Sequence, residues 1–371
     1  MNKTNLESAI ALRRELHQHP ELSNEEVWTK QHLIEFLQKN TTNIEIIDKG
    51  EWFYAAYRVG KDKKNIAFRA DYDALPMDEV IDIPWGSQFP GKAHKCGHDG
   101  HSATLAAFAL EVDQKGAEHN IFFLFQPAEE VGAGALKCLP LIEEEKVDEI
   151  YGYHNMSGMP AHSINIMKGV TQCASTGMII KMVGAPAHAS QPETGVNPAF
   201  AIANIIQSIP ELTKESDGIL LCTVIQVDIG ERAFGMSASK GELLLTLRAL
   251  YEDEMTALRD SLIDLANQEA EKYGLTVSFE YSDTFPETRN HDESVDVIMN
   301  VAKEKGYVVN EMDKPFRGSE DYGHYTKLTK GAFCFIGNGE DHPPVHTSAY
   351  DFRDDLIEVA CDLFKGISGT N

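Results

Sequence analysis

Residues 64–76 (KNIAFRADYDALP) decide the fold of this 371-residue chain, because a strand pattern ends there in acidic residues. The apolar run reaches Ala70, and the polar turn that follows carries Asp71 and Asp73. A short apolar run that is bounded by a turn is typical of a buried strand. The same plan occurs three more times, in residues 119–130 (HNIFFLFQPAEE), 148–155 (DEIYGYHN) and 331–347 (GAFCFIGNGEDHPPVHT).

The groups that follow these strands are acids and imidazoles: Glu129 and Glu130, His154, and His346 after a Gly/Pro loop. Helical patterns between the strands, such as residues 102–112 (SATLAAFALEV), indicate an α/β sheet with crossovers. Open α/β sheets bind ligands at the carboxyl edge of their strands, so we expect these groups to converge. The alternative is that loops are simply polar, but then Ser, Lys and Asn would be as frequent as Asp, Glu and His.

The pattern changes between residues 173 and 284, where strands and helices follow in the order βαββαβ. This order is the ferredoxin-like unit, a compact sandwich. We therefore predict a mixed-sheet α/β catalytic domain, residues 1–172 and 285–371, that is interrupted by an inserted domain, residues 173–284. The six predicted elements of the insert are residues 174–184, 197–209, 219–230, 241–250, 253–274 and 275–282.

The composition restricts the class of protein. A content of 42% hydrophobic and 25% charged residues is typical of a globular chain. A net charge of −25 would repel nucleic acid and anionic membranes, so we expect neither as a partner. Charges at Glu7, Arg13 and Arg14 interrupt the N-terminal segment, which predicts an amphipathic helix rather than a secretion signal. Six cysteines without a CxxC pair are consistent with a cytoplasmic, reduced protein.

Residues 94–103 (HKCGHDGHSA) concentrate three histidines, one cysteine and one aspartate. Histidine and thiolate are strong donors for zinc-like ions, and aspartate commonly orients such ligands. Adjacent carboxylates, as in residues 126–130 (QPAEE), rarely both reach one metal, so one can bind while its neighbour acts as a general base. A solvated loop would also explain an isolated acidic pair. One zinc needs only four ligands, so two ions are expected from five donors: Cys96, His98, Glu130, His154 and His346.

Six motifs occur in the order that is typical of one family. With them the chain resembles the dinuclear metallo-amidohydrolases related to aminoacylase and carboxypeptidase G. Within that family it is similar to the hippurate hydrolases, N-acetyl-amino-acid deacetylases and auxin-conjugate hydrolases. The motifs are RRELHQHPELS (13–23), RADYDALP (69–76), HKCGHDGHSA (94–103), QPAEE (126–130), GYHN (152–155) and VHTSAYDF (345–352).

The resemblance implies roles for individual residues. It makes Glu129 the base and Asp73 a residue that orients a ligand. It makes the insert a lid and a dimerisation surface, with His188 in residues 184–192 (GAPAHASQP) directed toward the active site. Two divalent ions (Zn, Mn, Co or Ni) would be held by Cys96, His98, Glu130, His154 and His346.

The implied activity is hydrolysis of small-molecule N-acyl amino acids by a homodimer. In that mechanism Glu129 removes a proton from the activated water and passes it to the leaving amine, and His188 helps to hold the oxyanion. A metallo-dipeptidase or carboxypeptidase would use the same centre. A non-catalytic metal-binding protein is disfavoured, because Glu129 would have no purpose there. Two departures from the family, Glu193 after Pro192 and residues 233–239 (AFGMSAS), concern the substrate and leave the ligands unchanged.

Overall fold

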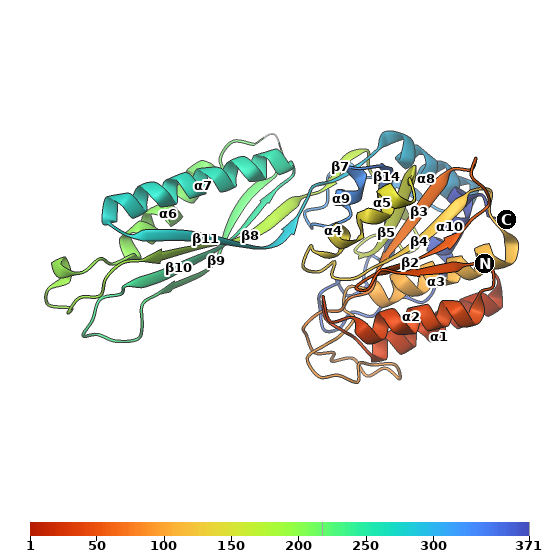
Figure 1. Cartoon of the computed structure of the whole chain (residues 1–371), viewed down its shortest axis with the longest axis horizontal. Helices are drawn as coiled ribbons and strands as arrows, with labels where there is room; N and C mark the ends of the chain where they lie inside the picture. Colours follow the sequence, from red (N-terminus) through yellow and green to blue (C-terminus); the bar gives the residue numbers. More distant parts are fainter. Residues whose placement is uncertain (217, 371) are drawn as a thin grey trace. The chain divides into compact units, whose positions relative to one another are not determined.

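The computed structural model describes residues 1–216 and 218–370, which form two units (Figure 1). The larger unit combines Met1–Thr171, Thr288–Lys314 and the chain from Asp321 onward. The smaller unit combines Gln172–Glu287 and Pro315–Glu320. The chain therefore leaves the larger unit for a long insertion, returns at Thr288, and leaves it again for residues 315–320 before completing it.

An eight-stranded mixed sheet forms the centre of the larger unit, in the order β1-β2-β4-β3-β5-β14-β6-β13. Its four middle strands, β4, β3, β5 and β14, are neighbours and run parallel. They are the four strands that the sequence predicts to end in polar groups, so their carboxyl ends lie at one edge. The strands are β1 (Glu45–Asp48), β2 (Phe53–Tyr57), β3 (Asn65–Asp71), β4 (Asn120–Gln126), β5 (Glu149–Ser157), β6 (Ile164–Ile166), β13 (Val309–Glu311) and β14 (Lys330–Gly339).

Helix α3 (His98–Lys115) is the central helix of the larger unit. It packs on β3 and β4, and α1 (Lys3–Gln18), α2 (Val27–Asn40) and α10 (Leu356–Ser368) pack on it in turn. Every residue of α3 from His98 to Val112 is buried. Its run of Ala, Leu and Phe suits this position, because a helix that is covered all round needs no polar face. The remaining helices of this unit are α4 (Gly134–Cys138), α5 (Pro140–Glu144), α8 (Asp292–Glu304) and α9 (Gly323–Thr326).

The smaller unit is a four-stranded antiparallel sheet in the order β11-β8-β10-β9, with two helices. Strands β8 and β10 alternate buried and partly exposed residues, as expected for a sheet that is covered on one face. The order βαββαβ and this strand order are ferredoxin-like, so the predicted fold class is confirmed. The elements are β8 (Ala174–Val183), α6 (Ala199–Leu212), β9 (Leu220–Ile229), β10 (Lys240–Ala249), α7 (Glu252–Tyr273) and β11 (Thr276–Phe285), with a short 3-10 turn η1 (Pro192–Thr194).

Residues 315–320 differ from the sequence prediction, which places them in the catalytic domain. In the structure they pack with the smaller unit. Phe316 forms a β-bridge with Gln172, and the amide of Cys173 donates to the carbonyl of Gly318 at 3.2 Å. The segment is a short polar loop without periodicity, so its sequence does not indicate which unit it joins. Beside the insertion, β7 (Gly169–Gln172) pairs with β12 (Thr288–Asn290).

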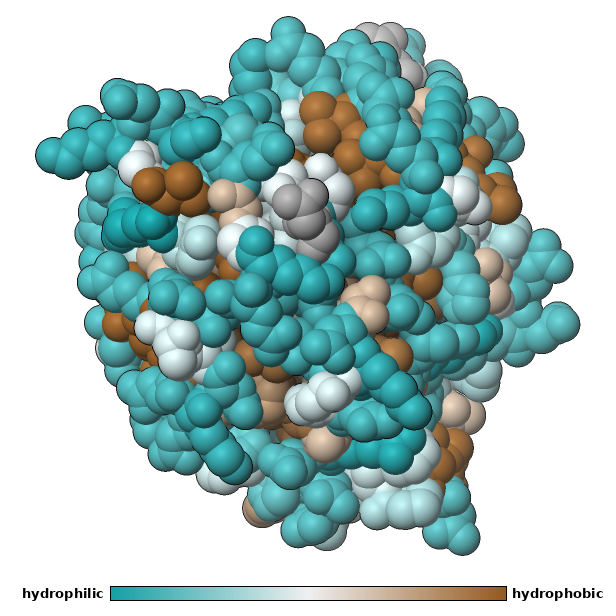
Figure 2. Space-filling view, turned by 90° about the vertical axis from the view of Figure 1, so that its right-hand side faces the viewer, coloured by the Kyte–Doolittle hydropathy of each residue, from teal (hydrophilic) through white to brown (hydrophobic). Residues whose placement is uncertain are grey.

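The surface agrees with the composition. Figure 2 shows a face that is mostly hydrophilic, with apolar residues scattered in small groups. Scattered apolar residues are normal on protein surfaces and mark no site by themselves. Among the helices of residues 1–216 and 218–370, none has the length and apolar character that a bilayer crossing requires.

Candidate metal centre

The predicted ligands come together at the carboxyl edge of the parallel strands. His154 lies on β5, and His98 is the first residue of α3. Glu130 follows β4, and His346 follows β14. Cys96 stands two residues before α3. The convergence that the strand pattern predicts is therefore present in the larger unit.

Cys96 is at the middle of the ligand set. Its Sγ atom lies 3.2 Å from Nε2 of His154 and 3.2 Å from Nε2 of His346. Glu130 completes the ring, with Oε2 at 3.3 Å from Nε2 of His346 and Oε1 at 3.7 Å from Nε2 of His98. Five donor atoms of N, O and S type thus face a common centre.

These donors form two overlapping groups, Cys96 with His98 and His154, and Cys96 with Glu130 and His346. In each group the donor atoms all lie within 4.8 Å of one another. Nε2 of His98 and Oε1 of Glu130 are buried without a hydrogen-bond partner in the described part of the chain. Buried polar atoms are normally satisfied, so these two atoms are available to bind cations. Mixed imidazole, carboxylate and thiolate donors suit zinc-like ions, and the set fits two of them with Cys96 shared.

The ionisation of the ligands shows what a metal would replace. Burial, together with Glu130 and Glu129, raises the pKa of the Cys96 thiol well above its usual value. Burial lowers the pKa of His98, but the nearby carboxylates of Asp71 and Asp73 outweigh it and raise that pKa to about 10. Protons therefore occupy these ligands in the metal-free protein, and cations would displace them.

His154 is prepared as a neutral ligand. Burial lowers the pKa of its imidazole well below the usual value, so the ring is neutral. Its Nδ1 lies 2.6 Å from the backbone carbonyl of Asn155. A proton on Nδ1 would donate to that carbonyl and leave the lone pair of Nε2, which lies 3.2 Å from Sγ of Cys96, free to bind a metal.

Asp73 contacts two of the predicted ligands without belonging to either group. Its Oδ1 lies 3.0 Å from Nδ1 of His98. Its Oδ2 accepts from the amide of Glu130 at 3.0 Å and from the hydroxyl of Ser23 at 2.7 Å. A carboxylate in this place fixes the tautomer of a ligating histidine and the position of the ligand carboxylate together.

The sequence prediction omits a buried network of polar contacts next to the predicted ligands. Oδ1 of Asp71 lies 2.6 Å from Nδ1 of His101, and Nε2 of His101 lies 2.6 Å from Oδ1 of Asn155. Asn155 in turn donates to the hydroxyl of Tyr350 at 2.6 Å. The available signal was the spacing of His98 and His101, because residues three apart lie on one helix face.

The backbone at the site is conformationally restricted. Gly97, between Cys96 and His98, has φ of +106°. Ala128 and His346 have φ of +51° and +61°, which is uncommon for residues with a Cβ. The amide of His346 donates to the carbonyl of Lys95 at 2.7 Å, which connects His346 to the Cys96 segment. Such positions persist only where surrounding contacts hold them.

The first motif, residues 13–23, supports the centre from α1. Buried Arg13 donates to Oδ2 of Asp99 at 2.8 Å and also contacts Asp351. Asp99 adjoins His98, and Asp351 lies in the segment after His346. One guanidinium thus connects the helix that begins at His98 with the loop that carries His346.

His188 belongs to the smaller unit, whereas the other candidate residues belong to the larger unit. It is exposed, its Nδ1 lies 2.7 Å from the hydroxyl of Ser190, and it forms a β-bridge with Met236. Met236 lies in residues 233–239, one of the two departures from the family pattern.

Known proteins resemble this chain over almost its whole length. It is 29% identical to N-acetylcysteine deacetylase of Bacillus subtilis (strain 168) over 369 residues, which are 97% of this chain and 95% of the relative. It is 28% identical to hippurate hydrolase of Campylobacter jejuni over 369 residues, covering 96% of this chain and 94% of the relative.

A solved structure and a family model agree with these relatives. A Bacillus subtilis protein described as a dinuclear metal binding peptidase from the M20 family superposes with a TM-score of 0.83 at 26% identity, covering 99% of this chain and 98% of that one. The family model described as Peptidase family M20/M25/M40 matches residues 67–368. The resemblance seen in the motifs is thereby confirmed, and the chain belongs to peptidase family M20/M25/M40.

Proposed function

We propose that this protein is a metal-dependent amidohydrolase that cleaves N-acyl amino acids to a carboxylic acid and a free amino acid. The observation that carries the proposal is Glu129, a buried carboxylate beside a full ligand set. Its Oε2 lies 3.9 Å from Nε2 of His98, and its neighbour Glu130 is in the ligand ring. Relatives named N-acetylcysteine deacetylase and hippurate hydrolase support this class of substrate.

Two divalent ions would be held by the ligand ring, with zinc, manganese, cobalt and nickel as candidates. When bound, such ions lower the pKa of a water molecule and polarise an amide carbonyl. Glu129 takes the proton of the attacking water and delivers it to the nitrogen of the leaving amino acid. Asp73 keeps His98 and Glu130 in place while this proton moves.

A homodimer through the smaller unit is part of the proposal. Strand β9 is at one edge of its sheet and carries exposed apolar side chains, among them Leu221, Ile225 and Val227. An exposed apolar edge strand favours pairing with a second chain. Phe234, 99% exposed in the loop after β9, adds to this surface. We place the enzyme in the cytoplasm, because its six cysteines are free and the proposed ligand Cys96 needs a reduced thiol.

His188 would donate a hydrogen bond to the oxyanion, within its own subunit or across the dimer. Mixing His188→Ala with Glu129→Gln subunits separates these cases. Recovery of activity on mixing supports donation across the dimer. Absence of recovery, with subunit exchange demonstrated, excludes it.

The substrate proposal is tested by reconstituting the protein with each metal and measuring hydrolysis of N-acetyl, N-benzoyl and longer acyl amino acids against dipeptides. We expect the acylated amino acids to be cleaved with the higher kcat/KM. Preference for substrates with a free amine would instead identify a dipeptidase, and the proposed substrate class would then be wrong.

A further inference from the structure

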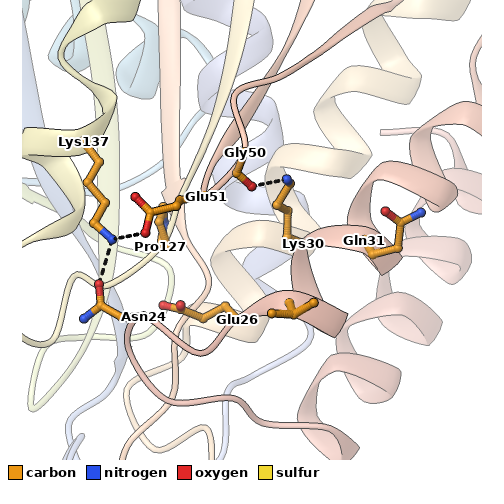
Figure 3. A pocket seen from close by; sticks show the side chains of 9 residues that line it. Asn24, Glu26, Lys30, Gln31, Gly50, Glu51, Pro127 and Lys137 are labelled. Carbon is orange, nitrogen blue, oxygen red and sulfur yellow. Dashed lines mark hydrogen bonds and ion pairs between the residues drawn. The ribbon is translucent and has the colours of Figure 1, made fainter.

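A buried carboxyl group contacts the turn that carries Glu129 and Glu130. Glu26, at the start of α2, is only 7% exposed and lines a pocket of about 410 Å³ (Figure 3). Lys30, Glu51, Pro127 and Lys137 line the same pocket. Glu26 is outside the 67–368 range that the family model matches.

Glu26 makes one direct contact with the turn. Its Oε1 accepts a hydrogen bond from the amide of Ala128 at 2.8 Å. Ala128 is fully buried, has φ of +51°, and immediately precedes Glu129. The carbonyl of Ala128 accepts from the amides of Ala133 at 3.2 Å and Gly134 at 3.0 Å. The carbonyl of Ala128 is therefore held by backbone amides of the turn itself, whereas its amide is held by the side chain of Glu26.

The other charged groups of the pocket do not replace Glu26 as an acceptor. Lys30 contacts Asp48 and the carbonyl of Gly50. Lys137 contacts Asn24 at 2.8 Å and Glu51 at 3.0 Å, as Figure 3 shows. Lysine ammonium groups only donate hydrogen bonds, and the carboxylate of Glu51 is already engaged by Lys137. Removal of the Glu26 carboxyl would leave a buried amide unsatisfied.

Two carboxylates thus hold the short segment between β4 and the ligand ring. Glu26 takes the amide of Ala128, and Asp73 takes the amide of Glu130 at 3.0 Å. We propose that Glu26 is a positioning residue, whose carboxyl oxygen holds the turn that presents Glu129 and Glu130 to the metal centre. For Glu129 the inference rests on the proposed function, whereas for Glu130 it concerns metal binding alone.

Two variants of similar size separate the hydrogen bond from packing. Glu26→Gln keeps an acceptor, and Glu26→Met does not. We expect Glu26→Met to weaken metal binding by about 10- to 100-fold, as is typical when a support of a metal ligand is lost, with a comparable fall in kcat. Glu26→Gln should remain close to wild type. Glu51→Gln and Glu51→Met, in the same pocket, are matched controls that should change neither quantity.

Metal affinity is measured by competition with a chelator, with zinc as the probe, so this readout needs no substrate. If the wild type binds zinc but cleaves no N-acyl amino acid, the proposed function fails and the affinity comparison still tests Glu26. Equal affinities for Glu26→Met and the wild type would overturn the inference. An equal loss in Glu26→Gln and Glu26→Met would also overturn it, because the acceptor would then be irrelevant.

The open pocket permits a second test. In Glu26→Ala, formate in the buffer can enter and again accept from the Ala128 amide. We expect formate to restore part of the metal affinity and kcat of this variant, and the larger pivalate ion to restore less. No response to formate, with the variant folded by circular dichroism, would count against the role of the carboxyl oxygen.

Discussion

Gly97 separates Cys96 from His98, and its replacement by alanine is the most quantitative test of the site's backbone. A Cβ atom at this position would lie 2.2 Å from Oδ1 of Asn155 and 2.7 Å from the hydroxyl of Tyr350. Asn155 is fully buried, and its side chain is engaged by His101 and Tyr350 at 2.6 Å each. Because both contacts hold the Asn155 side chain, the added Cβ must displace this side chain and break at least one of them.

Two effects add to lower the free energy of unfolding in Gly97→Ala. Placing a residue with a Cβ at φ of +106° costs of order 1–3 kcal/mol. Loss of a buried hydrogen bond around Asn155 adds roughly 1–3 kcal/mol. The sum, roughly 2–6 kcal/mol, is a large part of the about 5–15 kcal/mol that stabilises a typical domain. Gly158→Ala is a matched control, because Gly158 has φ of +83° and nothing within 4 Å of the added Cβ.

Urea unfolding of the metal-free protein, followed by tryptophan fluorescence, measures this difference. All three tryptophans, Trp28, Trp52 and Trp85, belong to the larger unit, so the signal reports the unit that holds the site. We expect Gly97→Ala to lose about 1–3 kcal/mol more than Gly158→Ala, and also to bind metal more weakly. Equal stability of the two variants, with wild-type metal affinity in Gly97→Ala, would refute the steric argument.

Two further predictions concern pH. Zinc binding should release protons at pH 7 and tighten as pH rises, because burial with Glu130 raises the pKa of Cys96 well above its usual value and carboxylates raise that of His98 to about 10. Titration calorimetry in buffers of different ionisation heats would show this, and buffer-independent heats would contradict it. Burial and Asp73 raise the pKa of Glu26 from 4.5 to about 7, so the folded state holds a proton that the unfolded chain releases in this range. The contribution of Glu26 to the free energy of unfolding should therefore fall as pH rises from 4.5 to about 7, and this part of the pH dependence should be absent from Glu26→Gln.

The acidic and imidazole residues that follow the predicted strands made much of the site predictable. Asp73, Glu130, His154 and His346 follow four apolar runs, and parallel neighbours bring such positions to one edge of a sheet. The alternation of the insert likewise indicated a ferredoxin-like unit. These inferences depend on local periodicity, which the sequence displays directly.

The supporting contacts depend on tertiary packing instead. In the sequence Arg13 and Glu26 are ordinary charged residues, and no local pattern indicates that Arg13 contacts Asp99 or that Glu26 contacts Ala128. His101 lies in the histidine-rich motif, but its partners Asp71 and Asn155 come from two different strands. Residues 315–320 carry no periodic pattern, so only their contacts assign them to the smaller unit.

Glu129→Gln separates catalysis from metal binding when metal content and hydrolysis are measured on the same sample. We expect two bound ions, wild-type stability and a loss of kcat of about 100-fold or more, because a general base is removed while the ligands remain. Glu130→Gln, its neighbour, should instead lose metal. Retention of hydrolysis by Glu129→Gln, or loss of its metal ions, would contradict the assignment of Glu129 as the base beside a dinuclear centre.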